Sequence, residues 1–413
     1  MDRNSREIAN PQVTRHGKGA KTLGQGRPYE QSHPWITFDT NKQLQQASAR
    51  FWMLLGEIRS KCDHIRYVPL AADTAKRLNQ VYFAKGVNAT TAIEGNTLSE
   101  EEVEARLKGQ LELPLSKAYL GREIDNMIGA YNRIISAVMD HAPLPITPAT
   151  LRDLNKEILA GLPDEPHVVP GELRQYSVAA GPYVGAPWED IPYLLARLCE
   201  WLDDMKAEGE ADRIPTAFIK AALAHVYIEW IHPFGNGNGR LGRLIEFAVL
   251  VESGVPLPAA HILTSHYNDT RTEYYRQLNE ASRNGGDLCG FLAYAAQGLV
   301  DGLVGAIKHL HRQQEDLMWR ALVDEEFIDK HTPAAHRQRM LAIELGRAQG
   351  RVKRSELRRL SQALFEEYYG KTPKTISRDV NRLRELHLVE GNLSVRARLE
   401  RVRGMRPFAH GGD

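Results

Sequence analysis

The stretch from His232 to Arg243 constrains this chain more than any other part of it. It reads His-Pro-Phe-Gly-Asn-Gly-Asn-Gly-Arg-Leu-Gly-Arg and lies between two apolar segments, Ile214 to Trp230 and Leu244 to Val251, whose spacing predicts helices. Because glycines let the backbone turn tightly, the N–H groups of this loop can converge on an anion where the second helix starts. The sequence therefore predicts a phosphate-binding loop between two buried helices.

The charged residues of this stretch indicate its chemistry. Arg240 and Arg243 are three residues apart, so both lie on one face of the first helical turn and can bind phosphate oxygens. His232 lies at the entrance of the loop, where it can act as a base on an incoming hydroxyl group. The Gly-Lys-Ser/Thr of a P-loop is absent, and a helix precedes the loop where a Rossmann turn needs a strand. Phosphoryl or nucleotidyl transfer is the predicted reaction class.

The stretch resembles the signature of the Fic family, His-x-Phe-x-(Asp/Glu)-Gly-Asn-Gly-Arg-x-x-Arg. The resemblance implies an enzyme that transfers AMP from ATP to a Ser, Thr or Tyr hydroxyl of a target protein. It implies that His232 is the general base and that Phe234 fixes the loop in the core. It also implies that the phosphates are bound by Gly237, Asn238, Gly239, Arg240 and Arg243. Asn238 is then expected near the α-phosphate and Arg243 at the γ-phosphate end.

One position departs from the signature. The acidic residue that holds Mg²⁺ in the family is Asn236 in this chain. An amide oxygen can coordinate Mg²⁺ but brings no negative charge. ATP as substrate and Mg²⁺ as cofactor are expected from the resemblance, while weaker metal binding, another donor and a lower rate all stay open.

A second motif lies far upstream. Thr90-Thr91-Ala92-Ile93-Glu94-Gly95 resembles the inhibitory motif of the family, Ser/Thr-x-x-x-Glu-Gly/Asn, in the subclass that carries it on a helix before the catalytic core. Thr90 and Glu94 are one helical turn apart and face the same direction. The resemblance implies that Glu94 pairs with Arg243 and so removes the partner of the γ-phosphate.

Two further segments resemble parts of the family that surround the nucleotide. The segment from Gly171 to Pro187, with Arg174 and Val178, is predicted to form a hairpin flap that docks an extended loop of the target beside the motif, with Gln175 to Val178 extended. Tyr274 and Tyr275 resemble residues that line the nucleotide pocket, although a place in the core suits them equally well.

The C-terminal end differs in charge from the rest of the chain. The whole chain of 413 residues has a net charge of +1, but residues 331–413 contain 18 Lys/Arg and 9 Asp/Glu. Helices predicted at Ala334 to Arg347, Arg354 to Leu360 and Thr375 to Leu386, followed by a short ribbon, resemble a winged helix-turn-helix. If the module binds DNA, its third helix presents Lys374, Thr375, Ser377, Arg378 and Arg382; docking of protein remains the alternative.

The predicted fold class is mostly α: a Fic-type helical bundle with a short β-hairpin flap, followed by a winged helix-turn-helix domain. The expected order is a flexible leader (1–33), an N-terminal helical region (34–115), the catalytic core (116–305), a helical connector (306–330) and the winged-helix-like domain (331–413). One helix is expected to begin at Thr97, where Thr97-Leu98-Ser99-Glu100 reads as a capping box. The other expected helices run from Asn41 to Asp63, Thr74 to Ile93, Ser116 to Met139, Thr147 to Ala160, Ile191 to Glu208 and Leu288 to Phe327.

The composition places the chain among globular intracellular proteins. Apolar residues make up 42% and charged residues 25%, no apolar run approaches the length of a membrane span, and the three cysteines have no paired spacing. We therefore expect a cytoplasmic protein without membrane contact. The family resemblance implies an enzyme and makes a homodimer one expected assembly state. The alternatives are a DNA-binding regulator whose Fic core only senses nucleotide, and a transferase that uses another donor.

Overall fold

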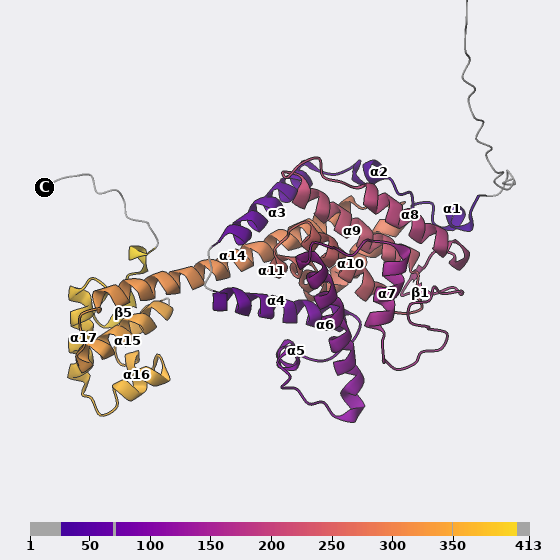
Figure 1. The fold of residues 1–413 in the computed structure, drawn as a ribbon. Helices are drawn as coiled ribbons and strands as arrows, with labels where there is room; N and C mark the ends of the chain where they lie inside the picture. The colour runs from indigo at the N-terminus through magenta and orange to yellow at the C-terminus, as the bar shows by residue number, and fades with distance from the viewer. Residues whose placement is uncertain (1–25, 69–71, 349, 403–413) are drawn as a thin grey trace, which may run out of the picture.

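The structure, a computed structural model, describes residues 26–68, 72–348 and 350–402. It contains two hydrophobic cores that are joined by one long helix (Figure 1). The larger core extends from Tyr29 to Leu310, and the smaller one from Trp319 to Leu399. Helix α14 (Cys289–Glu326) contributes to both, since Leu310 lies in the first core and Trp319 in the second. At 38 residues it spans about 57 Å, enough to carry the C-terminal region away from the body.

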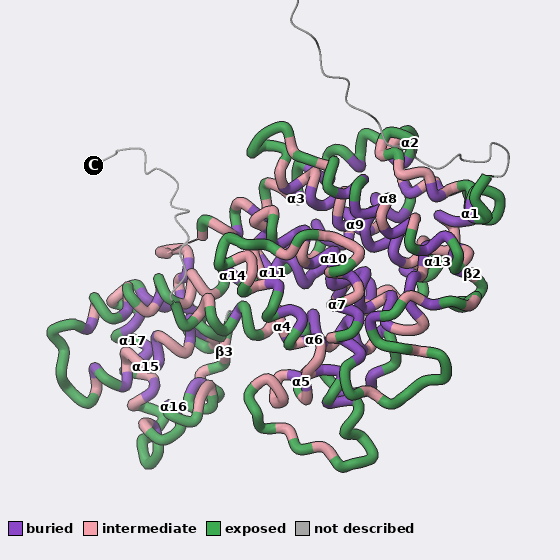
Figure 2. Tube along the Cα trace, turned by 45° about the vertical axis from the view of Figure 1, so that its right-hand side comes forward, coloured by how far each residue is buried: buried purple, intermediate pink, exposed green. Residues whose placement is uncertain are grey.

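The larger core is built around α9 (Arg213–Ile231) and α10 (Asn238–Glu252), which pack against each other on either side of the Gly/Asn-rich loop. Both helices lie in the buried centre of the body (Figure 2). The surrounding helices are α3 (Ala49–Tyr67), α4 (Ala72–Ile93), α6 (Ala118–Met139), α7 (Pro148–Ile158), α8 (Ile191–Asp204), α12 (Ile262–Asp269) and α13 (Arg271–Arg283). Shorter helices lie at the edges: α1 (Pro28–Ser32), α2 (Thr40–Leu44), α5 (Glu100–Leu107) and α11 (Leu257–Ala260).

The N-terminal helices differ from the predictions in two places. The predicted leader falls largely outside the described residues, but α1 is already structured, with Tyr29 buried and its N–H bonded to Asp190. Helix α5 begins after Ser99, whose capping box uses Glu102; the predicted start at Thr97 was therefore wrong. Asn96 explains the shift, because its side chain accepts a hydrogen bond from the N–H of Leu98 and holds the preceding residues in a turn.

The predicted hairpin is shorter and displaced along the chain. Its strands are β1 (Ala179–Ala180) and β2 (Tyr183–Val184), paired antiparallel across Gly181, so the strand expected at Gln175 to Val178 was wrong. The carbonyl of Tyr176 is instead taken by the side chain of Arg174. Pairing reaches back only to Val178, whose carbonyl accepts the N–H of Gly185.

The C-terminal region forms three helices and a small sheet: α15 (Pro333–Arg347), α16 (Gln362–Glu367), α17 (Pro373–Glu385), β3 (Val352–Lys353), β4 (Val389–Glu390) and β5 (Ser394–Ala397). The antiparallel sheet has the order β3-β5-β4. The helix predicted at Arg354 to Leu360 was wrong: the chain forms a 3₁₀ turn at Leu357–Arg359, and α16 begins only after Ser361. The hydroxyl of Ser361 caps that helix by accepting the N–H of Leu364.

Helix α14 also corrects the sequence reading of membrane segments. By length and composition alone it is long and apolar enough to cross a membrane, a test that core helices of globular proteins also pass. Half of its apolar window is buried inside the protein, where α14 packs against α3, α12 and α13. Packing in the core accounts for the buried part of this apolar run.

Candidate active site

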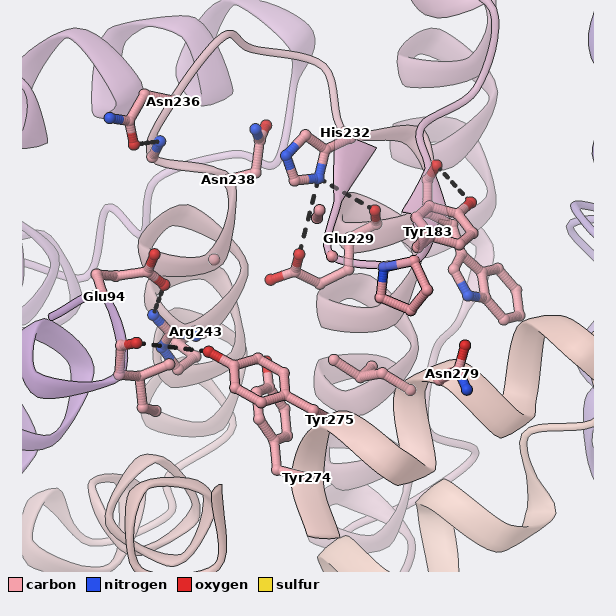
Figure 3. A pocket seen from close by; sticks show the side chains of 18 of the residues that line it. Glu94, Tyr183, Glu229, His232, Asn236, Asn238, Arg243, Tyr274, Tyr275 and Asn279 are labelled. Atoms are coloured by element: carbon pink, nitrogen blue, oxygen red, sulfur yellow. Dashed lines mark hydrogen bonds and ion pairs between the residues drawn. The ribbon is translucent and has the colours of Figure 1, made fainter. Parts of the chain in front are cut away.

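A cavity of about 640 Å³ opens beside the Gly/Asn-rich loop (Figure 3). It brings together the end of α9, the loop, the start of α10, the turn after α4, the hairpin and α13. The predicted site residues that line it are Glu94, His232, Asn236, Gly237, Asn238, Gly239, Arg243, Tyr274 and Tyr275. A volume of this size suits a nucleotide.

His232 ends helix α9 in a left-handed conformation, with φ 49° and ψ 61°. A non-glycine residue in this region is strained, and such strain is common where a side chain is aimed at a ligand. The Nδ1 atom lies 3.3 Å from the carbonyl oxygen of Glu229. Burial lowers the pKa of His232 from its ordinary value of 6.5, although the Glu229 carboxylate opposes this effect. The imidazole is therefore neutral at pH 7, as a general base must be.

The loop after His232 is braced from within. Asn238 makes reciprocal hydrogen bonds with Phe234, accepting its N–H at 3.0 Å and donating to its carbonyl at 2.9 Å. Phe234 is buried in the core. The Asn238 amide, predicted to lie near the α-phosphate, is thus committed to the loop, although the residue lines the cavity.

Glycines give the loop its shape at two points. Gly237 precedes α10 with φ 81°, a left-handed conformation that favours glycine. A Cβ on Gly239 would approach the Glu94 carboxylate to 2.4 Å, so only glycine leaves room there. The backbone N–H groups at the start of α10 therefore face the cavity without side chains between, in a geometry suited to phosphate.

Arg243 is almost fully buried and is held by α4 and the turn after it. Its Nη2 donates to the Glu94 carboxylate at 2.5 Å and to the carbonyl of Thr90, and its Nε donates to the Thr90 hydroxyl at 3.0 Å. Burial alone would raise the pKa of Glu94, but the positive charge of Arg243 brings it below its ordinary value. The pair is therefore ionised at neutral pH. Gly95 follows with φ 101° and ends the helix.

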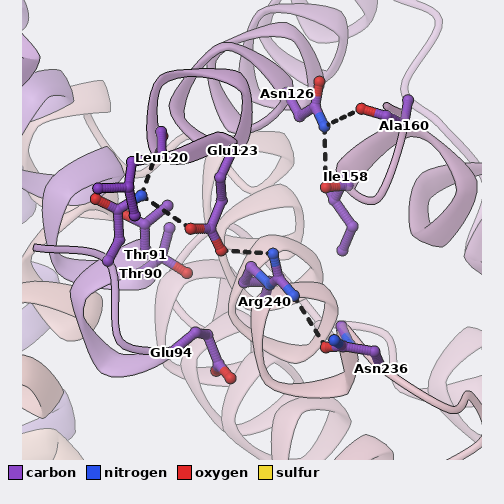
Figure 4. Close-up of polar contacts among 12 residues, drawn as sticks. Thr90, Thr91, Glu94, Leu120, Glu123, Asn126, Ile158, Ala160, Asn236 and Arg240 are labelled. Atoms are coloured by element: carbon purple, nitrogen blue, oxygen red, sulfur yellow. Dashed lines mark hydrogen bonds and ion pairs between the residues drawn. The ribbon is translucent and has the colours of Figure 1, made fainter. Parts of the chain in front are cut away.

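Arg240 is not among the residues that line the cavity, and its guanidinium lies between Glu123 and Asn236 (Figure 4); its predicted phosphate contact stays a prediction. Its Nη1 donates to Glu123 of α6 at 2.6 Å, and its Nη2 donates to Asn236 at 3.0 Å. Glu123 also accepts a hydrogen bond from Asn96, just beyond the Glu94-Gly95 turn. In this arrangement Glu123 connects the guanidinium of Arg240 on α10 with α6 and, through Asn96, with the turn after α4.

Asn236 does not present a ligand to a metal in this arrangement. Its amide oxygen accepts the N–H of Gly237 and a hydrogen bond from Arg240, while its Nδ2 donates to Glu165. Among the described residues there is no group of three His, Cys, Asp or Glu side chains that could hold a metal ion. The residues around Asn236 therefore do not fit a protein-held Mg²⁺.

The two tyrosines take different places. Tyr274 is buried, stacks on Tyr267 and bonds to the ring of His225 through its hydroxyl at 2.9 Å. Tyr275 is 49% exposed and donates to the carbonyl of Ile93 at 3.4 Å. Both tyrosines line the cavity: Tyr275 forms an exposed part of its wall beside the turn that carries Glu94, whereas Tyr274 is otherwise enclosed in the core.

Arg174, predicted to belong to the flap, holds the flap to the loop. It is only 3% exposed and donates to the backbone carbonyls of His232, Tyr176, Ala186 and Ile231. Burial lowers its pKa to about 10. Val178 is half-buried next to the hairpin. Both residues of β1 are exposed, and docking of an extended peptide by the flap stays a prediction.

The side chains singled out on α17 divide by exposure. Lys374, Arg378 and Arg382 are exposed, whereas Thr375 and Ser377 are half-buried. Asp379 lies between these positions and was missed by sequence reasoning. It is buried and accepts hydrogen bonds from Arg337 and Tyr368. Asp379 therefore anchors α17 to α15 and α16.

Sequence reasoning also missed the acidic partners in the body. Glu229 lines the cavity one turn before His232, and that spacing could have revealed it. Glu123 lies 117 residues from Arg240, and no local pattern connects them.

Comparison with known proteins agrees with this geometry. Residues 145–250 match the Fic/DOC family. This chain is 26% identical to protein adenylyltransferase fic-1 of Caenorhabditis briggsae over 272 residues, which is 65% of this chain. It is also 26% identical to protein adenylyltransferase Fic of Nematostella vectensis over 259 residues, which is 62% of this chain. The matches cover 50% and 55% of those proteins, so the chain spans about half the length of the curated relatives.

Solved structures show the same fold. A Fic family protein from Desulfovibrio desulfuricans matches with a TM-score of 0.52 and 22% identity, over 85% of this chain and 97% of the other. A fragment of Fic-1 from Caenorhabditis elegans matches with a TM-score of 0.52 and 25% identity, over 63% and 74% of the two chains. These likenesses confirm the predicted mostly-α Fic fold.

Proposed function

Because this chain carries a Fic domain, we propose that it is a protein adenylyltransferase that moves AMP from ATP to a hydroxyl group of a target protein. The domain match and the similarity to proteins named protein adenylyltransferase support this activity. The observation that carries it is the cavity itself, which joins a neutral histidine, a Gly-rich helix start and a buried arginine.

The transfer step follows from these groups. A target hydroxyl in the cavity gives its proton to Nε2 of His232, and its oxygen attacks the α-phosphorus of ATP. The bond from the α-phosphorus to the bridging oxygen breaks, and pyrophosphate leaves with the electron pair. Backbone N–H groups at the start of α10 stabilise the charge on the phosphates, and Mg²⁺ accompanies ATP as part of the substrate.

The protein holds this activity in check through Glu94. With Arg243 paired to Glu94 and Thr90, the arginine is unavailable to the γ-phosphate. The carboxylate also lies within the cavity wall, where it repels the triphosphate. ATP in this state lacks the contact that aligns its α-phosphorus with the hydroxyl.

The test is labelling of cell-lysate proteins by Glu94→Gly protein with Mg²⁺ and α-³²P-ATP. We expect bands labelled from the α-phosphate but not from γ-³²P-ATP, and lost with an added His232→Ala change. Label from the γ-phosphate would assign phosphoryl transfer. Label that survives His232→Ala, or no label from either donor, contradicts the proposal.

A second candidate function concerns residues 331–402. Three helices with an antiparallel three-stranded sheet, and the exposed Lys374, Arg378 and Arg382 on α17, favour a winged helix that binds DNA backbone. Binding of a DNA duplex should then weaken steeply with salt. DNA binding that is unchanged in a Lys374→Ala, Arg378→Ala double variant would contradict this second function. DNA binding that persists in His232→Ala would show that it does not depend on AMP transfer.

A further inference from the structure

Glu229 faces the cavity one turn before His232 on α9. Its side chain is 16% exposed, and its carboxylate oxygen Oε2 lies 3.9 Å from Nδ1 of His232. The backbone carbonyl of the same residue lies 3.3 Å from that nitrogen (Figure 3). Nδ1 therefore faces two acceptors that belong to one residue.

This surrounding fixes the tautomer of His232. A nitrogen that faces a carbonyl and a carboxylate carries the proton, because a lone pair there would meet two negative oxygens. The other nitrogen, Nε2, then keeps its lone pair for a hydroxyl in the cavity. The same arrangement stabilises the imidazolium that proton transfer produces, because the carboxylate lies near its positively charged Nδ1.

Behind Glu229 lies a row of buried polar side chains. Oε1 of Glu229 lies 3.9 Å from Nε2 of His225, which is fully buried. On the other side of that ring, Nδ1 lies 3.5 Å from the carboxylate of Glu246, which accepts a hydrogen bond from Tyr267 at 2.9 Å. A Cβ on Gly242 would come within 2.9 Å of the His225 ring, so α10 approaches this chain closely only with glycine.

The charges around His232 come from several elements. Burial lowers its pKa first of all; Glu229 on α9 and Glu94 after α4 raise it, and Arg174 of the flap lowers it. Glu94 is paired with Arg243, whereas the charged partners nearest to the Glu229 carboxylate are, within the described part of the chain, the two histidines at 3.9 Å. When Glu94 leaves the site, Glu229 is the carboxylate that stays.

We infer that Glu229 is a positioning residue of the transfer reaction: it holds His232 with Nε2 open to the cavity and balances the charge of the imidazolium that forms when Nε2 takes the hydroxyl proton. This inference rests on the proposed function for its catalytic part. The titration of His232 tests it separately, because that titration needs neither ATP nor a target.

The experiment compares the full chain with Glu229→Gln, which keeps the shape and removes the charge. With ¹³C at Cε1 of histidine, the signal lost in His232→Ala identifies His232, and its titration is followed by NMR. We expect the midpoint to move about 1 pH unit lower in Glu229→Gln, because the cation loses its nearest carboxylate. In the Glu94→Gly background, kcat should fall about 10-fold while KM for ATP does not rise.

Two further variants make the outcome decisive. Glu229→Asp keeps the charge at a shorter reach and should move the midpoint less than Glu229→Gln does. Glu200→Gln neutralises an exposed glutamate on α8 and should change neither readout. An unchanged His232 midpoint in Glu229→Gln, or an equal shift in both Glu229 variants, overturns the inference whatever the activity. A shifted midpoint in a protein that transfers no AMP overturns the proposed function instead.

Discussion

The two arginines of the loop, Arg240 and Arg243, lie one turn apart on α10 and are both nearly buried, yet the fold gives them different partners. Arg240 pairs with Glu123, whose side chain is 12% exposed in the interior between α6 and α10. Arg243 pairs with Glu94, whose side chain is 30% exposed at the cavity. The first pair connects structural elements, whereas the second occupies the ligand site.

Under the proposed function the Glu123–Arg240 pair serves stability and the Glu94–Arg243 pair serves control, because a ligand in the cavity can reach only Arg243. A phosphate that enters the cavity competes with Glu94 for Arg243. Competition for Arg240 would need its interior partners, Glu123 and Asn236, to separate. Loss of Glu94 should therefore release activity, and loss of Glu123 should reduce stability.

The largest expected effect is that of Glu94→Gly on activity. Arg243 regains its place at the γ-phosphate, and the rate of AMP transfer should rise about 10²-fold, the usual worth of one such charge contact. Incorporation of label from α-³²P-ATP measures it. Glu112→Gly, in an exposed loop before α6, is the matched control and should leave the rate unchanged. Equal rates for Glu94→Gly and the unmodified chain would show that Glu94 does not inhibit AMP transfer.

The next effect is on stability. Glu123→Ala leaves the buried Arg240 and Asn96 without their acceptor, and the free energy of unfolding should fall by about 3 kcal/mol. Urea denaturation followed by circular dichroism measures this change. The control is Glu157→Ala, which breaks the more exposed pair with Arg133 between α7 and α6 and should cost less than about 1 kcal/mol. Equal losses in the two variants would contradict the interior role of Glu123.

A smaller effect is expected at Asn236, next to Arg240. Asn236→Asp places a carboxylate at the position that is acidic in the Fic signature and keeps an oxygen toward Gly237 and Arg240. In the Glu94→Gly background, the Mg²⁺ concentration for half-maximal rate should fall about 3-fold, because a carboxylate attracts the metal that ATP brings. No change in Mg²⁺ dependence would show that position 236 does not meet the ion.

The smallest effect concerns pH. The pKa of Glu94 lies below its ordinary value of 4.5 in the folded chain, so its pair with Arg243 is complete above that value and is lost only as pH falls through the lowered pKa. The ratio of rates between Glu94→Gly and the unmodified chain should therefore stay constant from about pH 8 to about pH 5. A ratio that falls toward pH 5 would show that Glu94 is protonated earlier than its pairing allows.

Local patterns predicted the helices and the loop well, and failed where a distant side chain intervened. Apolar spacing predicted α9 and α15 almost to the residue, but the predicted start of α10 at Leu244 was too late, because glycines in the first turn concealed a helix that begins at Asn238. The hairpin was misplaced since Arg174 takes the carbonyls that a strand would use. The burial of Arg174 and Arg240 could not be predicted either, because it depends on partners that are distant in the sequence.

The sequence by itself determined the Gly/Asn-rich loop between two helices, the histidine at its entrance and the glutamate motif upstream, because each depends on residues within a few turns of one another. Tertiary structure decided which arginine faces the cavity, which amide braces the loop and which carboxylate stands behind His232. Those outcomes depend on burial and on partners as far away as Glu123. A buried charge takes whichever acceptor the fold brings to it, and only the packed helices determine that acceptor.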